Sequence, residues 1–431
     1  MATAAVPHPR VVVRYHDRAQ CLLTDVPARP QRSSRVMLVA AAGYGKSSAL
    51  EAGRPADGVL VRAAELVGRP LPHPRWLGVD DLDDLPPANQ LRLLQQLANA
   101  PADVRVVVAS RSPLDPGWMR GQVQQRGPMH LALDAYTTAR VLAEEYGVLD
   151  PAVAATVHRL TQGWPALVHL AGETLADHPD ADLADALCRP GSTTDRWLQS
   201  AVLAPLGDSA RTILGLVADL GPVTPGVCKL LAHCTQLDDV DTTVHQLLGL
   251  GLLAGHRRLA SAQLVTPVPV VAAVLQRGDG RALSSPDLQM AAARCYEAEG
   301  LPYQAAQACA RAGNTPALEA LLAERGQQML WQGYAAEVVE LFRLAPGLAR
   351  SPTAQRTLGE ACRMAGDAAA ALRTFEPLIE RANRKGWDAG LASRVAMVHY
   401  GRGDSEQALA ALDAALGTAD PAAVATDQDS I

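Results

Sequence analysis

Aromatic residues and long hydrophobic runs are scarce in this sequence. Phe, Trp and Tyr together account for 4% of its 431 residues, whereas hydrophobic residues of all kinds account for 48%. The core must therefore consist mainly of Ala, Leu and Val, a composition that favours helices. No run of 18 or more apolar residues occurs, and the N-terminus lacks the charged start and apolar stretch of a signal peptide. We therefore expect a cytoplasmic protein that makes no contact with a membrane.

Paired cysteines and a basic surface are also missing. The seven cysteines lack C-x-x-C spacing, which argues against a zinc site or a disulfide framework and fits a reducing compartment. A net charge of −6 argues against a protein whose main task is to grip nucleic acid. The chain is too long for a single core, and its length suggests about three domains.

A glycine-rich stretch at residues 38–52, LVAAAGYGKSSALEA, matches most of the phosphate-binding pattern G-x-x-x-x-G-K-[ST]. It follows a continuous apolar run, Val36–Val39, which predicts a buried parallel strand, and Ser47 opens a helical stretch. Ala40 stands where the pattern has its first glycine. The alternative is a plain turn between a strand and a helix, with an incidental Lys-Ser pair.

The residue types of this stretch suit a phosphate ligand. Glycines at 43 and 45 let backbone N–H groups point inward, the Lys46 ammonium can reach β- and γ-phosphates, and the Ser47 hydroxyl can bind Mg²⁺. Lys46 is also a candidate catalytic residue. The predicted nucleotide-binding residues of the loop are Ala42, Gly43, Tyr44, Gly45, Lys46, Ser47 and Ser48.

An acidic pair after a second apolar run predicts the metal partner of this loop. Trp76–Val79 reads as a short strand that ends at Asp80 and Asp81. Asp80 would hold Mg²⁺, and Asp81 would orient or deprotonate the attacking water. The alternative is an acidic loop in which Asp83 and Asp84 are merely solvated.

A third apolar run, Val104–Ala109, is followed by Ser110 and Arg111. Ligands of open parallel sheets bind beyond the carboxyl ends of the strands, so Arg111 would contact the γ-phosphate and distinguish ATP from ADP. We therefore predict Arg111 as a nucleotide-binding and catalytic residue, the alternative being an ordinary surface arginine.

Four motifs, AAGYGKSS, GVDDLDDL, VVVASRS and LTQGWPALVHLAGETL, together resemble the STAND-class signal-transduction ATPases of the MalT-like, large LuxR-type (LAL) regulator family. Alanine at position 40 matches the loop of that family. The resemblance implies ATP or ADP with Mg²⁺ as cofactors. It also implies that Gly163, Trp164 and Pro165 lie against the adenine, although this segment could instead be a structural kink. By the same resemblance, Thr266, which stands where the family has a histidine, is implied to contact the nucleotide.

The resemblance implies a multidomain α/β + α fold. Only 80 − 46 = 34 residues separate Lys46 from Asp80, so we expect a reduced parallel sheet from which a strand-helix unit has been lost, and impaired hydrolysis. The predicted domains are a P-loop core (1–130), a helical lid (131–190), a winged helix (191–284), TPR-like repeats forming an α-solenoid (285–418) and a flexible tail (419–431).

Local patterns predict elements within these domains. Residues 131–186 carry helical periodicity, with Thr137 or Thr138 as a helix cap. Residues 251–267 read as a hairpin. In the family, the winged helix is an interdomain arm that does not read DNA.

Glycines recur near the C-terminus at positions 300, 333, 366 and 403, with spacings of 33, 33 and 37 residues. This is close to the tetratricopeptide period of about 34, and predicts helical hairpins that turn at each glycine. The alternative is a set of generic helical hairpins without a binding role. No helix-turn-helix follows, so DNA contact would need a missing domain or a partner.

Our leading hypothesis is an ATP/ADP switch that regulates transcription. An inducer or a regulatory protein would bind the repeats, nucleotide exchange would permit self-association, and slow ATP hydrolysis would reset the switch. The main alternative is a non-hydrolysing, nucleotide-bound scaffold that holds a protein partner. A metabolic kinase is a third option, but the sequence offers no acceptor site.

Overall fold

The computed structural model describes residues 35–72, 74–101, 103–112, 123–179, 181–237, 239–257, 263–277 and 284–417. The predicted tail lies outside these residues. The chain forms two compact units. The N-terminal unit holds the sheet and the helices that follow it, and the C-terminal unit consists of helical pairs.

The N-terminal unit contains a five-stranded sheet with the strand order β2-β3-β4-β1-β5, in which all neighbouring strands are parallel. The strands are β2 (Val59–Arg62), β3 (Trp76–Asp80), β4 (Arg105–Ser110), β1 (Arg35–Val39) and β5 (Val123–Arg126). Strands β1 and β4, which lie inside the sheet, are mainly apolar because both faces of the sheet are covered. The strands predicted near residues 36, 76 and 104 are confirmed.

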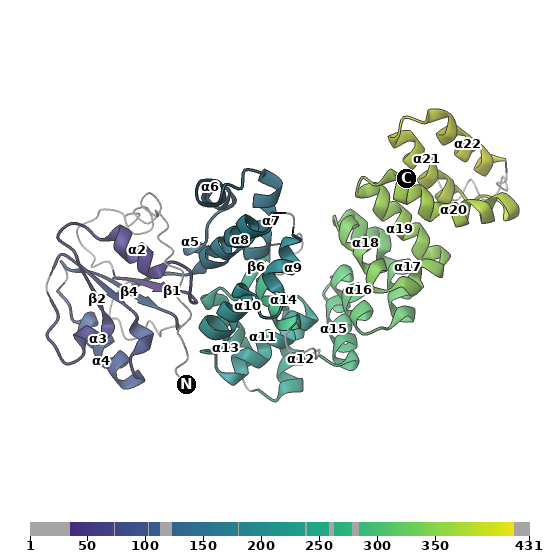
Figure 1. Ribbon diagram of the computed structural model, residues 1–431. Coiled ribbons are helices and arrows are strands. Elements are labelled where there is room, and N and C mark those ends of the chain that lie inside the picture. Colours follow the sequence, from purple (N-terminus) through teal and green to yellow (C-terminus); the bar gives the residue numbers. More distant parts are fainter. Residues whose placement is uncertain are drawn as a thin grey trace. The chain divides into compact units, whose positions relative to one another are not determined.

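Helices cover both faces of this sheet, with α2 (Lys46–Gly53) on one side and α3 (Ala63–Leu66) and α4 (Pro87–Ala98) on the other (Figure 1). The expected loss of a strand-helix unit is wrong, because β2 and α3 both fit between Lys46 and Asp80. The segment between Lys46 and Asp80 is short because its helices are short: α2 has 8 residues and α3 has 4.

Helices continue the N-terminal unit after the sheet. Its first helices are α5 (Pro128–Leu131), α6 (Ala135–Tyr146), α7 (Pro151–Thr161), α8 (Pro165–Asp177), α9 (Leu183–Cys188) and α10 (Thr193–Trp197), followed by a π-helical turn (Leu198–Leu203). The helical periodicity is thereby confirmed. The predicted cap is wrong, because Asp134 caps α6 by accepting a hydrogen bond from the backbone of Thr137. A carboxylate one position before the helix can reach this N–H group.

The helices that come next in the chain are α11 (Asp208–Leu220), α12 (Pro225–Thr235), α13 (Val240–Leu250) and α14 (Pro269–Arg277). The residues of α12 up to Leu230 belong to the C-terminal unit, and α11 and α13 contact the strands of a two-stranded hairpin. The predicted hairpin is confirmed as the antiparallel pair β6 (Leu253–Arg257) and β7 (Gln263–Pro267).

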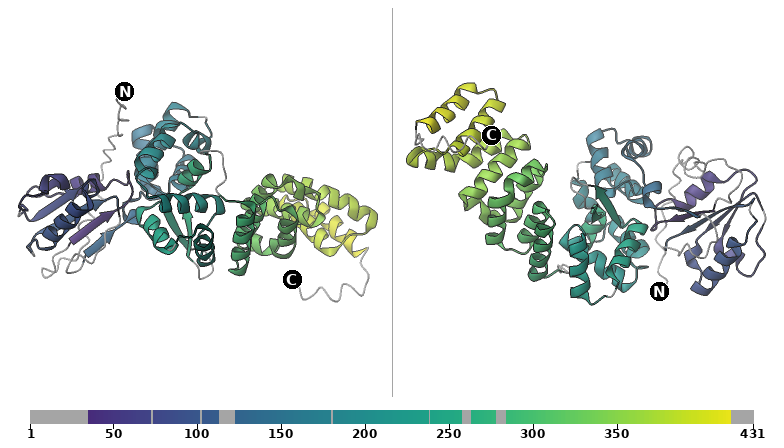
Figure 2. Two further views of the ribbon diagram at one scale, coloured as in Figure 1. Left: turned by 90° about the horizontal axis from the view of Figure 1, so that it is seen from below. Right: turned by 180° about the vertical axis from the view of Figure 1, so that it is seen from behind.

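The C-terminal unit is a series of antiparallel helical pairs (Figure 2). The helices are α15 (Pro286–Ala298), α16 (Pro302–Arg311), α17 (Thr315–Trp331), α18 (Ala335–Leu344), α19 (Pro352–Met364), α20 (Ala368–Lys385), α21 (Ala389–Gly401) and α22 (Ser405–Leu416). The four predicted glycines lie in the turns within these pairs, with φ of 73°, 86°, 87° and 83°. Glycine adopts these left-handed angles without a steric penalty, so the predicted hairpins are confirmed.

Close packing between α19 and α20 depends on one glycine. Gly359 lies against the ring of Phe375, which is fully buried. A Cβ atom at position 359 would be 2.4 Å from the Cε1 atom of that ring. The glycine therefore lets the two helices approach at this point.

We expect Gly359→Ala to destabilise the helical pairs by about 1–3 kcal/mol, because the added methyl group overpacks this contact. The matched control is Gly401→Ala in α21, where a Cβ would meet no atom within 4 Å. That change should be neutral or stabilise the helix by up to about 1 kcal/mol. Calorimetry of both full-length variants checks this, and equal melting transitions would contradict it.

A buried histidine makes the stability of the N-terminal unit depend on pH. His169 of α8 is 4% exposed, and the Tyr146 hydroxyl hydrogen-bonds its Nδ1 atom at 2.8 Å. Burial lowers the pKa of His169 to about 4. The exposed unfolded chain has the ordinary histidine pKa of about 6.5. Protonation therefore favours the unfolded state, and stability present above pH 6.5 is lost as the pH falls toward 4.

We expect this loss to be roughly 3 kcal/mol, because each unit between the folded and unfolded pKa values corresponds to about 1.4 kcal/mol. His169→Gln should flatten the pH dependence of the free energy of unfolding between pH 4 and 6.5. His233→Gln, at an exposed histidine of α12, is the control and should leave the slope unchanged. An unaltered slope in His169→Gln would refute the assignment.

Candidate nucleotide site

The glycine-rich loop connects β1 to α2, as the sequence predicts. Gly43 and Gly45 have φ of 77° and 75°, in the left-handed region that favours glycine. This backbone lets successive N–H groups face one concave side, which is the geometry of an anion-binding nest. These two φ angles agree with the predicted glycine-rich turn.

Lys46 is buried at the centre of the loop, with 8% of the residue exposed. Its ammonium donates to the carbonyl oxygens of Ala40 and Ala41 at 2.8 and 2.9 Å. Burial lowers the pKa of Lys46 to about 8, although the neighbouring carboxylate of Asp83 acts in the opposite direction. The cation therefore lies within the loop, close to the place where phosphates would bind.

Asp80 ends β3 and faces the start of α2. Burial raises the pKa of Asp80, and a hydrogen bond from the Ser47 side chain partly offsets this effect. The backbone N–H of Asp81 also donates to Asp80 Oδ1 at 2.9 Å. A carboxylate and a hydroxyl in contact are suitable oxygen ligands for Mg²⁺, which usually completes its shell with water and phosphate oxygens. Among the described residues, no group of three or more His, Cys, Asp or Glu side chains could hold a metal on its own.

Arg111, just after β4, faces two carboxylates. Its guanidinium lies 3.5 Å from Asp81 Oδ1 and 3.5 Å from Asp83 Oδ2. Its backbone N–H donates to Asp83 Oδ1 at 2.6 Å. Asp81 has a φ of 53°, a left-handed conformation that is rare for a non-glycine residue. Asp83 thus positions Arg111, whereas the sequence offered it only as a solvated residue.

These residues meet at a cavity of about 450 Å³ beside the loop. Most of the predicted loop and strand-end residues line it: Ala42, Gly43, Gly45, Lys46, Ser47, Ser48, Asp80, Asp81 and Arg111. Five further residues line the cavity and were not predicted as site residues: Arg62, Asp83, Ala109, Ala166 and Trp197. Arg62 is the last residue of β2 and so lies at the carboxyl end of a parallel strand, where ligands bind, but β2 was not predicted from the sequence. Trp197 carried no sequence signal, because α10 reaches the loop only through tertiary packing.

Tyr44 and the predicted adenine segment pack behind the cavity. Trp164 is fully buried, stacks on Tyr44 with ring centroids 4.6 Å apart, and donates from Nε1 to Ala42 O at 3.0 Å. Gly163 is pressed against Leu133, whose carbonyl oxygen would lie 1.9 Å from an added Cβ. Tyr44, Gly163, Trp164 and Pro165 are absent from the cavity lining. An adenine contact of the last three residues stays a prediction.

The end of α13 contacts the loop from another side. The backbone N–H of Ala41 donates to Leu250 O at 2.9 Å, and the Tyr44 hydroxyl donates to Gly251 O at 2.8 Å. Thr266 pairs with Ala254 in the hairpin and does not line the cavity. Its predicted nucleotide contact also stays a prediction.

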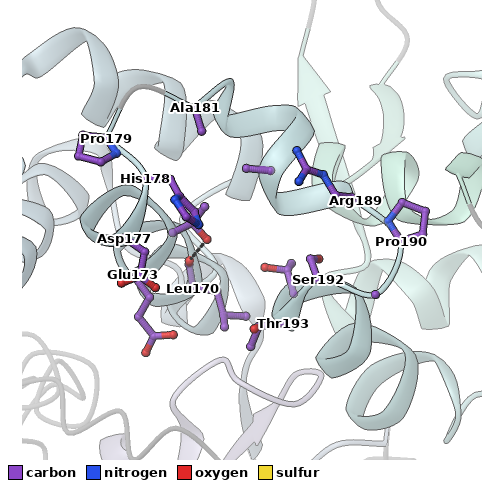
Figure 3. A pocket seen from close by; sticks show the side chains of 14 residues that line it. Leu170, Glu173, Asp177, His178, Pro179, Ala181, Arg189, Pro190, Ser192 and Thr193 are labelled. Carbon is purple, nitrogen blue, oxygen red and sulfur yellow. Dashed lines mark hydrogen bonds between the residues drawn. The ribbon is translucent and has the colours of Figure 1, made fainter.

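A second cavity, of about 770 Å³, lies among α8, α9 and α10. Figure 3 shows His178 on one side of it and Arg189 and Ser192 on the other. Arg189 is already paired with Asp185 at 3.1 Å, and the Ser192 hydroxyl donates to Leu187 O. None of the predicted site residues lines this cavity.

In the described part of the chain, no helix is long and apolar enough to span a bilayer.

Comparisons with known proteins assign no family to this chain. No protein-family model and no curated protein matches the chain. Among solved structures, a Walker-type ATPase of Pyrococcus abyssi is similar at 14% identity with a TM-score of 0.42, over 61% of this chain and 95% of that one. Two RuvB variants of Thermotoga maritima show 16% and 15% identity with TM-scores of 0.26 and 0.27, over 54% of this chain and 84% of theirs. The P-loop fold of the N-terminal unit follows from its own strand order and loop geometry.

Proposed function

We propose that this protein binds ATP and ADP with Mg²⁺ and acts as a nucleotide-controlled regulatory switch. The observation that carries the proposal is the meeting of Lys46, Ser47, Asp80 and Arg111 at one cavity beside the glycine-rich loop. Three strands contribute to this site at their carboxyl ends, where open parallel sheets bind their ligands.

Different residues of the cavity would contact the phosphates, the metal ion and the attacking water. The N–H groups around Gly43 and Gly45 and the Lys46 ammonium would bind the phosphates. Ser47 and Asp80 would hold Mg²⁺, which neutralises phosphate charge when bound. Asp81 is the proposed residue that orients water, and Arg111 the one that senses the γ-phosphate.

Hydrogen bonds from the rest of the N-terminal unit support a switch rather than a simple binding site. The N–H group of Ala166 in α8 donates to Gly43 O at 3.1 Å, and Leu250 at the end of α13 accepts from Ala41 N. A ligand that changes the loop must therefore change these contacts. In the proposed scheme, residues 131–190, with α6–α9, act as the lid, and residues 191–284, with α10–α14 and the hairpin, as the winged helix of a STAND-type ATPase.

The helical pairs of the C-terminal unit would supply the input. Stacked helical pairs build the extended surfaces on which TPR-like repeats bind ligands. We propose that an inducer or a regulatory protein binds there, that self-association follows nucleotide exchange, and that transcription is the output through a further domain or a partner.

The ion pair between Arg111 and Asp81 favours a second candidate, a nucleotide-bound scaffold that does not hydrolyse ATP. A carboxylate that is paired with a guanidinium must leave that contact before it can orient a water molecule. Measuring phosphate release separates the two functions, since a switch should release phosphate slowly and a scaffold should release none.

The first test replaces the lysine of the loop. Lys46→Ala should weaken the binding of ATP and ADP at least about a hundredfold, because it removes the buried cation that faces the phosphates. Lys385→Ala is the matched control, since the chain has only three lysines and Lys385 is exposed at the end of α20. Titration calorimetry measures both variants. Unchanged affinity in Lys46→Ala would eliminate the phosphate-loop assignment.

The second test addresses the metal. Asp80→Asn should abolish the gain in ATP affinity that Mg²⁺ gives, because the neutral amide is a poorer ligand for a hard cation than a carboxylate. Asp84→Asn changes an exposed carboxylate in the same turn and should keep the gain. Titrations with Mg²⁺ and with EDTA compare the two variants, and a full Mg²⁺ effect in Asp80→Asn would refute Asp80 as the metal ligand.

A further inference from the structure

Three aromatic side chains surround the glycine-rich loop, and we call Tyr44, Trp164 and Trp197 the aromatic cluster. Tyr44 stacks on Trp164, and Trp197 meets Trp164 edge to face with ring centroids 5.9 Å apart. Aromatic residues make up only 4% of the chain, yet three of them contact one another at this loop.

The polar atoms of the cluster are not equally satisfied. The Tyr44 hydroxyl donates to Gly251 O, and Trp164 Nε1 donates to Ala42 O. Trp197 Nε1 is buried and has no hydrogen-bond partner in the described part of the chain. A buried donor without a partner is rare in folded proteins, because it has lost its bonds to water. We therefore ask which group could accept a hydrogen bond from the indole N–H of Trp197.

The position of Trp197 shows where such an acceptor would come from. Trp197 is 6% exposed and lines the cavity beside the loop, whereas Trp164 does not. Its Cζ2 and Cη2 atoms lie 2.8 and 2.9 Å from the place of a Cβ on Gly43, so the six-membered ring of the indole lies against the loop backbone. That backbone is the part of the loop whose N–H groups form the phosphate nest.

We propose that Trp197 is a nucleotide-binding residue whose indole N–H donates a hydrogen bond to a phosphate oxygen. The inference rests on the proposed nucleotide-binding function and adds a ligand contact from α10 to those from the sheet. Phosphate is favoured over the base or the ribose because the ring edge lies at Gly43, within the phosphate-binding turn. The contact also makes the position of α10 depend on whether the phosphate site is filled.

Trp197→Phe tests this, since it keeps an aromatic ring and removes only the fused ring and its N–H group. We expect roughly tenfold weaker binding of ADP and of inorganic pyrophosphate, since a hydrogen bond to a charged group is lost. Trp331→Phe, at an exposed tryptophan of the C-terminal unit, is the control and should bind both ligands as the unaltered protein does. Melting temperatures of both variants are recorded alongside the titrations.

The indole proton itself provides a second readout that does not depend on a variant's stability. In the full-length protein with ¹⁵N-labelled tryptophan, the Trp197 resonance is the one that Trp197→Phe removes. Saturating pyrophosphate should shift this resonance downfield, and adenosine should leave it in place.

The outcomes separate the inference from the function on which it rests. If the unaltered protein binds neither ADP nor pyrophosphate, the proposed function fails. If it binds both, while Trp197→Phe binds equally well and the indole resonance does not move, the function stands and the role of Trp197 is overturned. A shift with adenosine and none with pyrophosphate would also overturn the phosphate contact.

Discussion

The burial of the Lys46 ammonium is the interaction on which the rest of the site depends. An isolated charge is costly to bury, so the surrounding chain must supply acceptors. The loop supplies two carbonyl oxygens, and the end of β3 and the turn after it bring carboxylates nearby. Burial nevertheless dominates, because it lowers the pKa of Lys46 to about 8. A polyphosphate would bring negative charge to the ammonium and favour its charged form.

The parallel sheet determines which groups can share this charge. Because all its strands point the same way, Asp80 of β3 and Arg111 after β4 emerge at the edge where β1 enters the loop. β4 lies between β1 and β3, so Arg111 stands between the lysine strand and the acidic strand. Its ion pairs with Asp81 and Asp83 follow from this strand order.

Sequence patterns could predict the parts of the site that local rules control. Continuous apolar runs marked β1, β3 and β4, polar residues at the ends of β3 and β4 marked the site, and spacing marked the glycine turns. β2 was not predicted, because VLVR is a short run that ends in a charged residue, and none of its residues is fully buried. Asp83 was undervalued because nothing local shows that the turn Leu82–Asp84 brings its carboxylate to the backbone of Arg111. Trp197, 197 − 43 = 154 residues beyond Gly43, depends entirely on tertiary packing.

The contacts of the loop also constrain how a switch could work. The carbonyl groups of residues 40–43 accept bonds from Lys46, Trp164 and Ala166, and the N–H of Ala41 donates to Leu250. A nucleotide that needs the Lys46 ammonium must compete with the carbonyls of Ala40 and Ala41, whereas the bonds from α8 leave the ammonium free to move. Coupling requires that the ligand bind the two arrangements of the loop with different affinity. Release of the lysine from its own loop is thus the step at which ligand binding can change the contacts with α8 and α13.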